Sequence, residues 1–299
     1  MNIGERIREL RISKLMTQAD LAGDRITRNM LSCIENGSAN PSLSTIIYIA
    51  GRLGVPAGFL LAEQGDEMAY RKMSNLSNIK KAYTTGDVQS CRSLCLSGCP
   101  EPDDEISLLL ANCDAEIAAE EFWSGRLRSS CRFFDEALSY AEKTIYSTDA
   151  IEAEIRVYFR FMERISHTLY SDLLDEGKAL SVKSNSIISQ YLDALDALDN
   201  GDVTVAEALI NQLAQSGSNS FFEAHLQSKL LIIIQKNYKQ AYRALQQLLQ
   251  DSGTPLNKIE LYTVLGDLEI CCREDEDYKN AYRYASEKVE LAEQLLTEY

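Results

Sequence analysis

Residues that end helices are scarce, with five prolines and 15 glycines among 299 residues. This scarcity excludes a loop-rich all-β protein and a low-complexity chain, and it favours a mostly helical fold. Long hydrophobic runs are also missing: the longest purely aliphatic stretch, Leu230 to Ile234, is far shorter than the roughly 20 residues of a membrane span. The first residues, MNIGERIREL, carry charges at once, so we expect no signal peptide and a soluble, cytoplasmic protein without a membrane partner.

Histidine is equally scarce, since only His167 and His225 occur and neither lies in a zinc-protease spacing. So few histidines disfavour acid–base, triad and zinc chemistry, and the sequence has no phosphate-binding glycine loop. We therefore expect no catalytic residue, no metal site and no cofactor, and we do not interpret the chain as an enzyme.

Eight cysteines are spread along the chain, and in a cytosolic protein they should be reduced thiols rather than disulfides. Cys91, Cys95 and Cys99 recur every four residues, a spacing that could hold a soft metal on one helix face. Burial as small apolar residues is the favoured interpretation, because free cysteine is commonly buried and no fourth ligand is near.

The net charge of −15 is distributed unevenly. Residues 1–65 hold seven Lys/Arg and six Asp/Glu, a net of +1, whereas the remaining residues hold 23 basic and 39 acidic side chains, a net of −16. An acidic segment repels nucleic acid, so residues 1–65 are the segment whose charge permits contact with DNA.

Start and stop signals divide the first 65 residues into five short helices. Thr17 is spaced to cap a very short helix through Ala22, and Thr27 to cap a helix from Arg28 to Ile34. Gly37 follows at a position suited to a left-handed residue. Two helices joined by a tight turn form a helix-turn-helix, whose second helix enters the major groove. The first helix is expected over Ile3 to Leu10. A further helix should start at Pro41-Ser42-Leu43 and run to Leu53, and Val55-Pro56 and Phe59-Leu60-Leu61 should begin the last short one.

The order and spacing of these residues resemble the Cro/phage-repressor-like, or XRE, helix-turn-helix family. The segments that carry the resemblance are Thr17-Gln18-x-x-Leu21-Ala22, Ile26-Thr27-Arg28-x-x-Leu31-Ser32-x-Ile34-Glu35-x-Gly37, Asn40-Pro41-Ser42-Leu43 and Ala50-x-x-Leu53-Gly54-Val55. One departure is the turn after Ala22, which is shorter than the family's usual pattern.

The resemblance implies a set of residues that bind double-stranded DNA. It makes Gln18 a phosphate contact. In the second helix of the motif, the recognition helix, the outward-facing residues are then Thr27, Arg28, Asn29 and Ser32 or Cys33. Arginine can pair bidentately with guanine and asparagine with adenine, which agrees with this assignment. The following loop could hold phosphates through Asn36, Ser38 and Asn40.

Other residues of this segment have structural interpretations. Glu35 should brace the domain rather than touch anionic DNA, and Arg6, Arg8 and Arg11 could form a solvated helix face. The expected core comprises Leu21, Ala22, Ile26, Leu31, Ile34, Ile46, Ile47, Ile49 and Leu53. A net charge of +1 gives one module weak DNA affinity, so we expect a homodimer that reads two half-sites.

Residues 66–299 show helix after helix, with short polar breaks at a repeating interval. The breaks are expected at Thr85-Gly86-Asp87, Trp123-Ser124-Gly125, Asn200-Gly201-Asp202, Lys236-Asn237-Tyr238 and Glu276-Asp277-Tyr278. The last unit, Tyr262-x-x-Leu265-Gly266 followed by Tyr278-x-x-Ala281-x-x-Tyr284, resembles the tetratricopeptide consensus. The prediction is therefore an all-α chain: residues 1–65 form a five-helix DNA-binding domain, and residues 66–299 form a tetratricopeptide-like solenoid of about six helical hairpins.

A solenoid of this kind presents a concave surface lined by the first helix of each hairpin, suited to peptides or partner helices. Most aromatic residues are interpreted as packing between hairpins. Polar candidates for peptide contact, each midway along an expected first helix, are Asn112, Arg156, Arg160, Gln190 and Gln227.

The combination of a Cro-like head (residues 1–65) and a tetratricopeptide-like body (residues 66–299) resembles the Rgg/PlcR/PrgX group of bacterial regulators. That resemblance implies a homodimeric transcription regulator whose body dimerises and senses a short signalling peptide. The alternative is an interaction scaffold, in which the solenoid binds a partner protein and the helix-turn-helix is only a tether.

Overall fold

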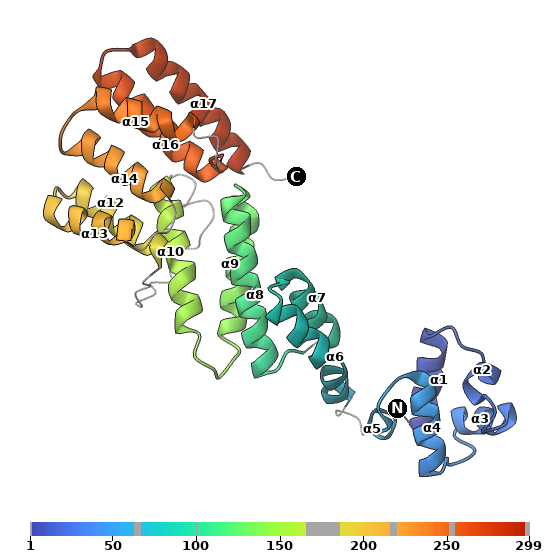
Figure 1. Cartoon of the computed structure of the whole chain (residues 1–299). Helices are drawn as coiled ribbons and strands as arrows, with labels where there is room; N and C mark the ends of the chain where they lie inside the picture. Colours follow the sequence, from blue (N-terminus) through green and yellow to red (C-terminus); the bar gives the residue numbers. More distant parts are fainter. Residues whose placement is uncertain are drawn as a thin grey trace. The chain divides into compact units, whose positions relative to one another are not determined.

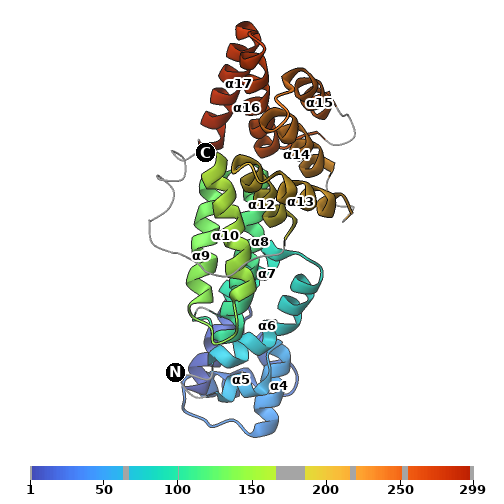
Figure 2. The same ribbon diagram turned by 90° about the vertical axis from the view of Figure 1, so that its left-hand side faces the viewer.

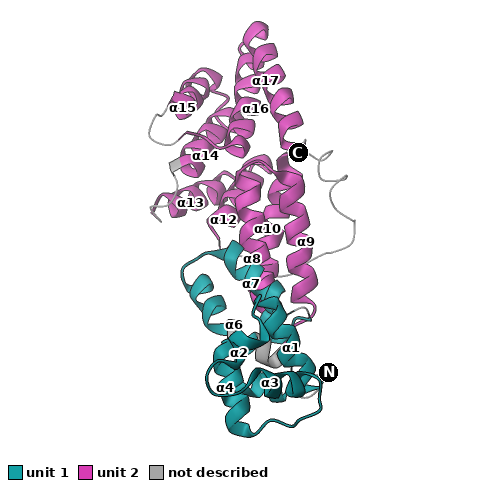
Figure 3. Ribbon diagram, turned by 90° about the vertical axis from the view of Figure 1, so that its right-hand side faces the viewer, with its two compact units in different colours: residues 1–106 teal, residues 107–299 magenta. Residues whose placement is uncertain are grey.

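The computed structural model describes residues 2–62, 67–99, 101–165, 186–215, 220–250 and 255–296, and every regular element in these ranges is a helix (Figure 1). The predicted all-α class is confirmed. The chain divides into two compact units, Met1–Ile106 and Ser107–Tyr299 (Figure 3). The predicted boundary between residues 65 and 66 lies outside the described residues and stays a prediction. None of the described helices is both long and apolar enough to cross a membrane.

Five helices open the first unit, and side-chain caps set where they begin. The helices are α1 (Ile3–Ser13), α2 (Gln18–Ala22), α3 (Arg28–Glu35), α4 (Leu43–Leu53) and α5 (Ala57–Leu61). Thr17 accepts a hydrogen bond from the Asp20 backbone N–H, and Thr27 accepts one from the Met30 backbone N–H. Both predicted N-caps are therefore confirmed. The short turn after Ala22 is complete before Arg28, the first residue of α3.

The core of these five helices contains most of the residues expected there. Its buried members are Ile7, Leu21, Ala22, Leu31, Ile34, Ile46, Ile49, Ala50, Leu53, Phe59 and Leu60. Two expectations need correction: Ile26 is only half-buried, and Ile47 is 56% exposed. The reason is the geometry of α4, whose inward face carries Ile46, Ile49 and Leu53; Ile47 lies about 100° away around a 3.6-residue helix.

The interpretation of Arg6 and Arg11 as a solvated face is wrong. Arg6 is 2% exposed, and its Nη1 donates to the carbonyl oxygens of Phe59, Leu60 and Ala62 at 3.2, 3.1 and 2.7 Å. These carbonyls lie at the end of α5, where helical backbone acceptors lack partners within the helix. Arg6 thus ties α1 to the end of α5. Arg8 is exposed, as expected.

The first unit continues with α6 (Glu67–Thr84) and α7 (Val88–Gly98), which are separated at the predicted break by Gly86 in the left-handed region. Cys91 and Cys95 on α7 and Cys99 directly after it are buried, which confirms their interpretation as core residues. Burial and the neighbouring Cys91 raise the pKa of Cys95 to about 12, which disfavours the thiolate that a soft metal would need.

Helical hairpins build the second unit. Its helices are α8 (Asp104–Trp123, beginning just before the boundary), α9 (Leu127–Ala141), α10 (Asp149–Ile165), α12 (Ile187–Asp199), α13 (Val203–Gln215), α14 (Ser220–Ile233), α15 (Tyr238–Gln250), α16 (Lys258–Glu274) and α17 (Tyr278–Leu296). Figures 1 and 2 show α16 and α17 side by side, and all predicted breaks between helices are confirmed. Residues 166–185, with His167, lie outside the described residues.

Aromatic side chains join the first helices of successive hairpins. Phe122 meets Tyr158 edge to face at 5.2 Å, Phe161 lies 5.8 Å from Tyr191, and Tyr191 lies 4.6 Å from Phe222 between ring centroids. Aromatic pairs at such separations contribute beyond their buried area. The interpretation of most aromatic residues as packing between hairpins is confirmed for this row.

Candidate nucleic-acid interface and ligand cavity

Helix α3 divides its side chains between the core and the solvent. Leu31, Ile34 and Glu35 are buried. The exposed residues at its N-terminal end and on its outer face are Thr27, Arg28, Asn29, Met30 and Cys33, and Ser32 is half-buried. The predicted outward positions are therefore available to a partner, and the helix offers one guanidinium and one amide at its N-terminal end.

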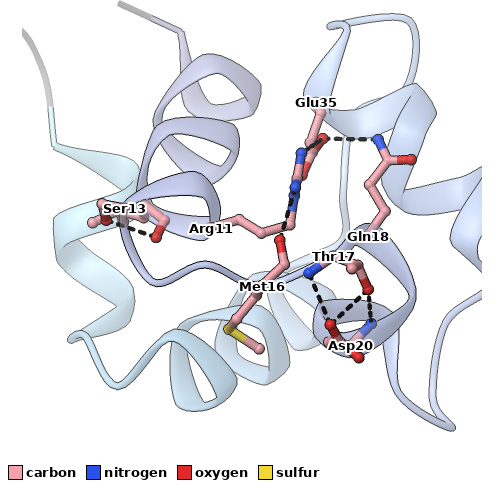
Figure 4. A network of polar contacts seen from close by, with 8 residues as sticks. Arg11, Ser13, Met16, Thr17, Gln18, Asp20 and Glu35 are labelled. Carbon is pink, nitrogen blue, oxygen red and sulfur yellow. Dashed lines mark hydrogen bonds and ion pairs between the residues drawn. The ribbon is translucent and has the colours of Figure 1, made fainter.

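A buried polar cluster fixes how α1, α2 and α3 pack. The Arg11 guanidinium binds both carboxylate oxygens of Glu35, with Nε–Oε1 at 2.7 Å and Nη2–Oε2 at 2.9 Å (Figure 4). Burial would raise the pKa of Glu35, but hydrogen bonds from Arg11 and Gln18 outweigh it and hold the pKa below its ordinary value. Glu35 is 3% exposed, so the prediction that it braces the domain is confirmed.

Gln18 takes part in the same cluster. Its Nε2 donates to Glu35 Oε2 at 2.9 Å, and its side chain is half-buried (Figure 4). Its amide therefore connects the first residue of α2 to the last residue of α3. Its predicted role as a phosphate contact stays a prediction.

The loop after α3 is closed by its own backbone. Gly37 has φ +72°, as predicted, and the backbone N–H and Oγ of Ser38 both donate to the Cys33 carbonyl oxygen, at 2.9 and 3.0 Å. Asn36 and Asn40 are exposed on either side. Contacts of Asn36, Ser38 and Asn40 with phosphate remain predictions.

The turn between α2 and α3 is held from α4 by two residues that sequence reasoning did not single out. Tyr48 Oη donates to the Ala22 carbonyl oxygen at 3.0 Å, and Arg52 donates to the Asp20 carbonyl oxygen. Gly23 makes room for them, because a Cβ there would lie 2.3 Å from Tyr48 Oη and its φ is +57°. The glycine in this turn is the sequence signal that could have pointed to a close approach.

The second unit contains a cavity of about 750 Å³ that is lined by α10, α12, α14, α16 and Lys288 of α17. Among the candidate peptide contacts, Arg160 lines it, whereas Asn112 and Gln227 line two other hollows. Arg156 and Gln190 line none of these three. The cavity lies where a concave solenoid surface was expected, but it draws on residues that the degenerate repeats did not identify.

Two arginines of α10 pair with an acidic row on α12 along one wall of the cavity. Arg160 binds Asp193, with Nη1–Oδ1 at 2.6 Å, and also Asp196. Arg164 binds Asp196 and Asp199. Arg160 and Arg164 are four residues apart on α10, and their partners Asp193, Asp196 and Asp199 are three residues apart on α12. This pairing fixes the register between the two helices.

A buried chain of hydrogen bonds crosses the other side of the cavity. Tyr191 Oη lies 2.8 Å from His225 Nδ1, His225 Nε2 lies 2.9 Å from Asp267 Oδ2, and Lys229 Nζ lies 2.9 Å from Asp267 Oδ1. Burial acts to raise the pKa of Asp267, but the hydrogen bond from His225 and the charge of Lys229 keep it lowered. The Asp267 carboxylate accepts a hydrogen bond from His225 Nε2–H, and in that tautomer Nδ1 accepts a hydrogen bond from the Tyr191 hydroxyl.

Comparisons with known proteins identify the N-terminal motif. Residues 7–60 match the helix-turn-helix family model, which confirms the motif identified in the sequence. The chain is 29% identical over 116 residues to the immunity repressor protein of Bacillus phage phi105, a match that covers 37% of this chain and 81% of that protein.

Solved structures align along nearly the whole chain at low identity. They include Bacillus thuringiensis PlcR in complex with the peptide PapR7 and DNA (14% identical, 99% of each chain, TM-score 0.28) and the PrgX/iCF10 complex (14%, 95% of each chain, TM-score 0.30). ComR from S. thermophilus, in complex with DNA and its signalling peptide ComS, is 16% identical over 97% of this chain and 100% of its own, with a TM-score of 0.23. PlcR and PrgX belong to the group that the sequence resembles.

Proposed function

We propose that the chain is a sequence-specific DNA-binding transcription regulator. The observation that carries the proposal is α3, whose N-terminal end presents Arg28 and Asn29 to solvent while its other face is anchored by Leu31, Ile34 and Glu35. In a helix-turn-helix, the N-terminal residues of the second helix contact base edges. We assign base reading to Arg28 and Asn29 and backbone contacts to the loop from Asn36 to Asn40.

The similarity to a phage immunity repressor supports a regulatory role for this head. The helix-turn-helix family model matches residues 7–60, which belong to the part of the chain whose charge tolerates DNA. We therefore place the protein on double-stranded DNA in the cytoplasm, where it controls transcription.

We propose further that the protein acts as a homodimer. Of the seven basic residues in the first 65, Arg6 and Arg11 are bound inside the head and cannot neutralise phosphate. A single head therefore has few cations with which to bind DNA, and two heads on one duplex multiply the affinity. The body, which carries the larger part of the chain, would hold the two heads together.

The body is assigned the sensing of a short peptide. Its cavity falls within the range of about 300–1,000 Å³ that is common for ligand pockets, and it combines aromatic walls with charged groups. Incubating the full-length protein with a random heptapeptide library and identifying retained peptides by mass spectrometry tests this assignment. The assignment fails if no peptide is retained above the level of a protein-free control.

A catalytic role has less support. Within the described part of the chain, the arrangement closest to a catalytic one is Tyr191–His225–Asp267. Burial raises the pKa of Tyr191 well above its ordinary value, so its hydroxyl keeps its proton. A buried, protonated phenol bound to histidine is a poor nucleophile.

The DNA proposal is tested by selection from random duplex DNA with the full-length protein at a stated salt concentration. We expect enrichment of an inverted repeat whose half-sites lie about 34–36 Å, or a multiple, apart. Absence of any enriched sequence, with and without retained peptides, would contradict the proposal. The scaffold alternative, in which the solenoid binds a partner protein, would then take its place.

A further inference from the structure

The turn between α2 and α3 carries a compact aromatic and cationic group that the proposed base contacts do not use. The Tyr48 ring lies across this turn, with its hydroxyl 3.0 Å from the Ala22 carbonyl oxygen and 3.4 Å from Asp24 Oδ1. The absence of a side chain at Gly23 allows the approach, since any Cβ there would overlap the Tyr48 hydroxyl. The ring is therefore fixed relative to the start of α3.

Two guanidinium groups lie over this one ring. The Cζ atom of Arg25 is 5.6 Å from the Tyr48 ring centroid, and that of Arg52 is 5.9 Å from it. Both arginines are exposed, and in the part of the chain that the structure describes neither makes an ion pair with a carboxylate. Stacking on an aromatic face restricts the motion of a guanidinium without using its N–H donors.

The acidic residues of the turn are already engaged. The carboxylate of Asp20 accepts hydrogen bonds from the backbone N–H and hydroxyl of Thr17, which hold its pKa below the ordinary value. The carboxylate of Asp24 faces the Tyr48 hydroxyl. Arg52 also attracts the Asp20 carboxylate from beyond ion-pair distance, and within the described residues neither guanidinium is neutralised by a bound carboxylate. Both can therefore attract a further anion.

The position of this group is equally informative. Arg25 precedes the N-cap of α3 by two residues, and Arg28 is the first residue of that helix. Once Arg6 and Arg11 are discounted, three of the five remaining basic residues of the head, Arg25, Arg28 and Arg52, are placed on or against this turn. The usable positive charge of the head is thus concentrated where α3 begins.

We propose that Arg25 and Arg52, oriented by Tyr48, form a binding site for a DNA backbone phosphate beside the bases that α3 reads. This inference rests on the proposed DNA-binding function. The planar guanidinium fork matches the oxygens of a phosphate, and two such groups can bind one phosphodiester from two directions. A backbone contact of this kind positions the recognition helix without reading sequence.

The test measures the salt dependence of DNA binding by full-length protein. The probe is the duplex recovered by selection, labelled for fluorescence anisotropy and titrated between 50 and 200 mM KCl. Removing one phosphate-binding cation makes the slope of log K against log[salt] shallower by about 0.9. Arg25→Gln should therefore bind less tightly than the wild-type protein at 50 mM KCl, and the ratio of the two affinities should fall about 3.5-fold per head by 200 mM. Base preference should be unchanged, because phosphate contacts carry no sequence information.

Matched variants distinguish the loss of an arginine charge from a change in the conformation of the turn. Arg52→Gln should lower the slope like Arg25→Gln, whereas Arg52→Lys keeps the charge and should retain most of it. Arg8→Gln removes an exposed charge of α1 that lies outside the turn and should leave the slope unaltered. Arg25→Gln is the more informative variant, since the only contact described for Arg25 is its stacking on Tyr48.

The outcomes distinguish this inference from the function on which it rests. If the wild-type protein binds the duplex with a clear salt slope but Arg25→Gln and Arg52→Gln keep that slope, the phosphate site is wrong and the DNA-binding function stands. If Arg52→Lys weakens binding as Arg52→Gln does, with an unchanged slope, Arg52 acts only through its bond to the Asp20 carbonyl. If the wild-type protein enriches no duplex, the proposed function itself fails.

Discussion

Arg11 of α1 and Glu35, the last residue of α3, are joined by two parallel hydrogen bonds of 2.7 and 2.9 Å, and Glu35 is 3% exposed. A bidentate pair of this kind fixes orientation as well as distance. The end of the recognition helix is therefore attached to a helix outside the helix-turn-helix.

Replacing Glu35 by glutamine should destabilise the head by about 1.5–3 kcal/mol, because the charged hydrogen bonds to Arg11 and Gln18 are weakened and the guanidinium is left without its counter-charge. Hydrogen–deuterium exchange over residues 1–62 measures this locally, without interference from the second unit. Glu9→Gln, at an exposed position of α1, is the control and should change stability by less than about 0.5 kcal/mol. Equal exchange in both variants would contradict the role of the pair.

The same carboxylate makes the stability of the head depend on pH. The pKa of Glu35 is lower in the folded head than the value of about 4.3 in an unfolded chain, so its contribution is complete above that value. The contribution disappears as the pH falls through the lowered folded pKa, where protonation breaks the pair. Amide exchange of the head between pH 7 and 3 should show this decline, and Glu35→Gln should reduce it, since an amide does not titrate.

Arg28→Ala should weaken binding to the selected duplex by about 1–3 kcal/mol and relax specificity at one base position. The residue is exposed at the start of α3, so its removal should leave folding unchanged. Competition with duplexes substituted at single positions locates the base it reads. Wild-type affinity and specificity in this variant would mean that the recognition helix reads DNA through other residues.

Asp24→Asn should strengthen DNA binding uniformly across sequences, by up to about 1 kcal/mol, since one exposed negative charge beside the Arg25 and Arg52 site is removed. The amide still offers an oxygen to the Tyr48 hydroxyl, so the turn should keep its conformation. Anisotropy titrations on selected and unrelated duplexes provide the measurement. A gain restricted to the selected duplex would point instead to an altered base contact.

Asp267→Asn should destabilise the second unit by about 1.5–3 kcal/mol, because Asp267 is the counter-charge of Lys229 and the acceptor for His225 in a buried site. Faster amide exchange in α14 and α16 is the expected result. Asp275→Asn, close in sequence but exposed, serves as the comparison and should behave like the wild-type protein. If the two variants exchange alike, the buried chain does not stabilise the unit.

Local signals predicted the helix boundaries well. Thr17, Thr27 and Gly37 act on neighbours within a few residues, so the sequence contains all the information that places them. The buried position of Arg6 could not be predicted, because its partners lie 53 to 56 residues away on α5 and at the residue after it, a relationship that no local pattern reveals. Ile47 was misplaced for a related reason, since consecutive isoleucines on α4 do not show which of them faces the core.

The cavity was harder to predict than the recognition helix. The outward face of α3 follows from the inward positions of Leu31 and Ile34, which a single helix period determines. The cavity wall depends on how separate hairpins are aligned, and the degenerate repeats do not set that alignment. His225 was visible as one of only two histidines, but its partners Tyr191 and Asp267 are 34 and 42 residues away.

The three hydrogen bonds from Arg6 to the last residues of α5 have a mechanical consequence. Ala62 is the last described residue before α6, and a force on its backbone would reach α1 through Arg6. From α1 it passes through Arg11 and Glu35 to the end of the helix that carries Arg28. The end of α5 and the surface that carries Arg28 are thereby connected by directed polar bonds.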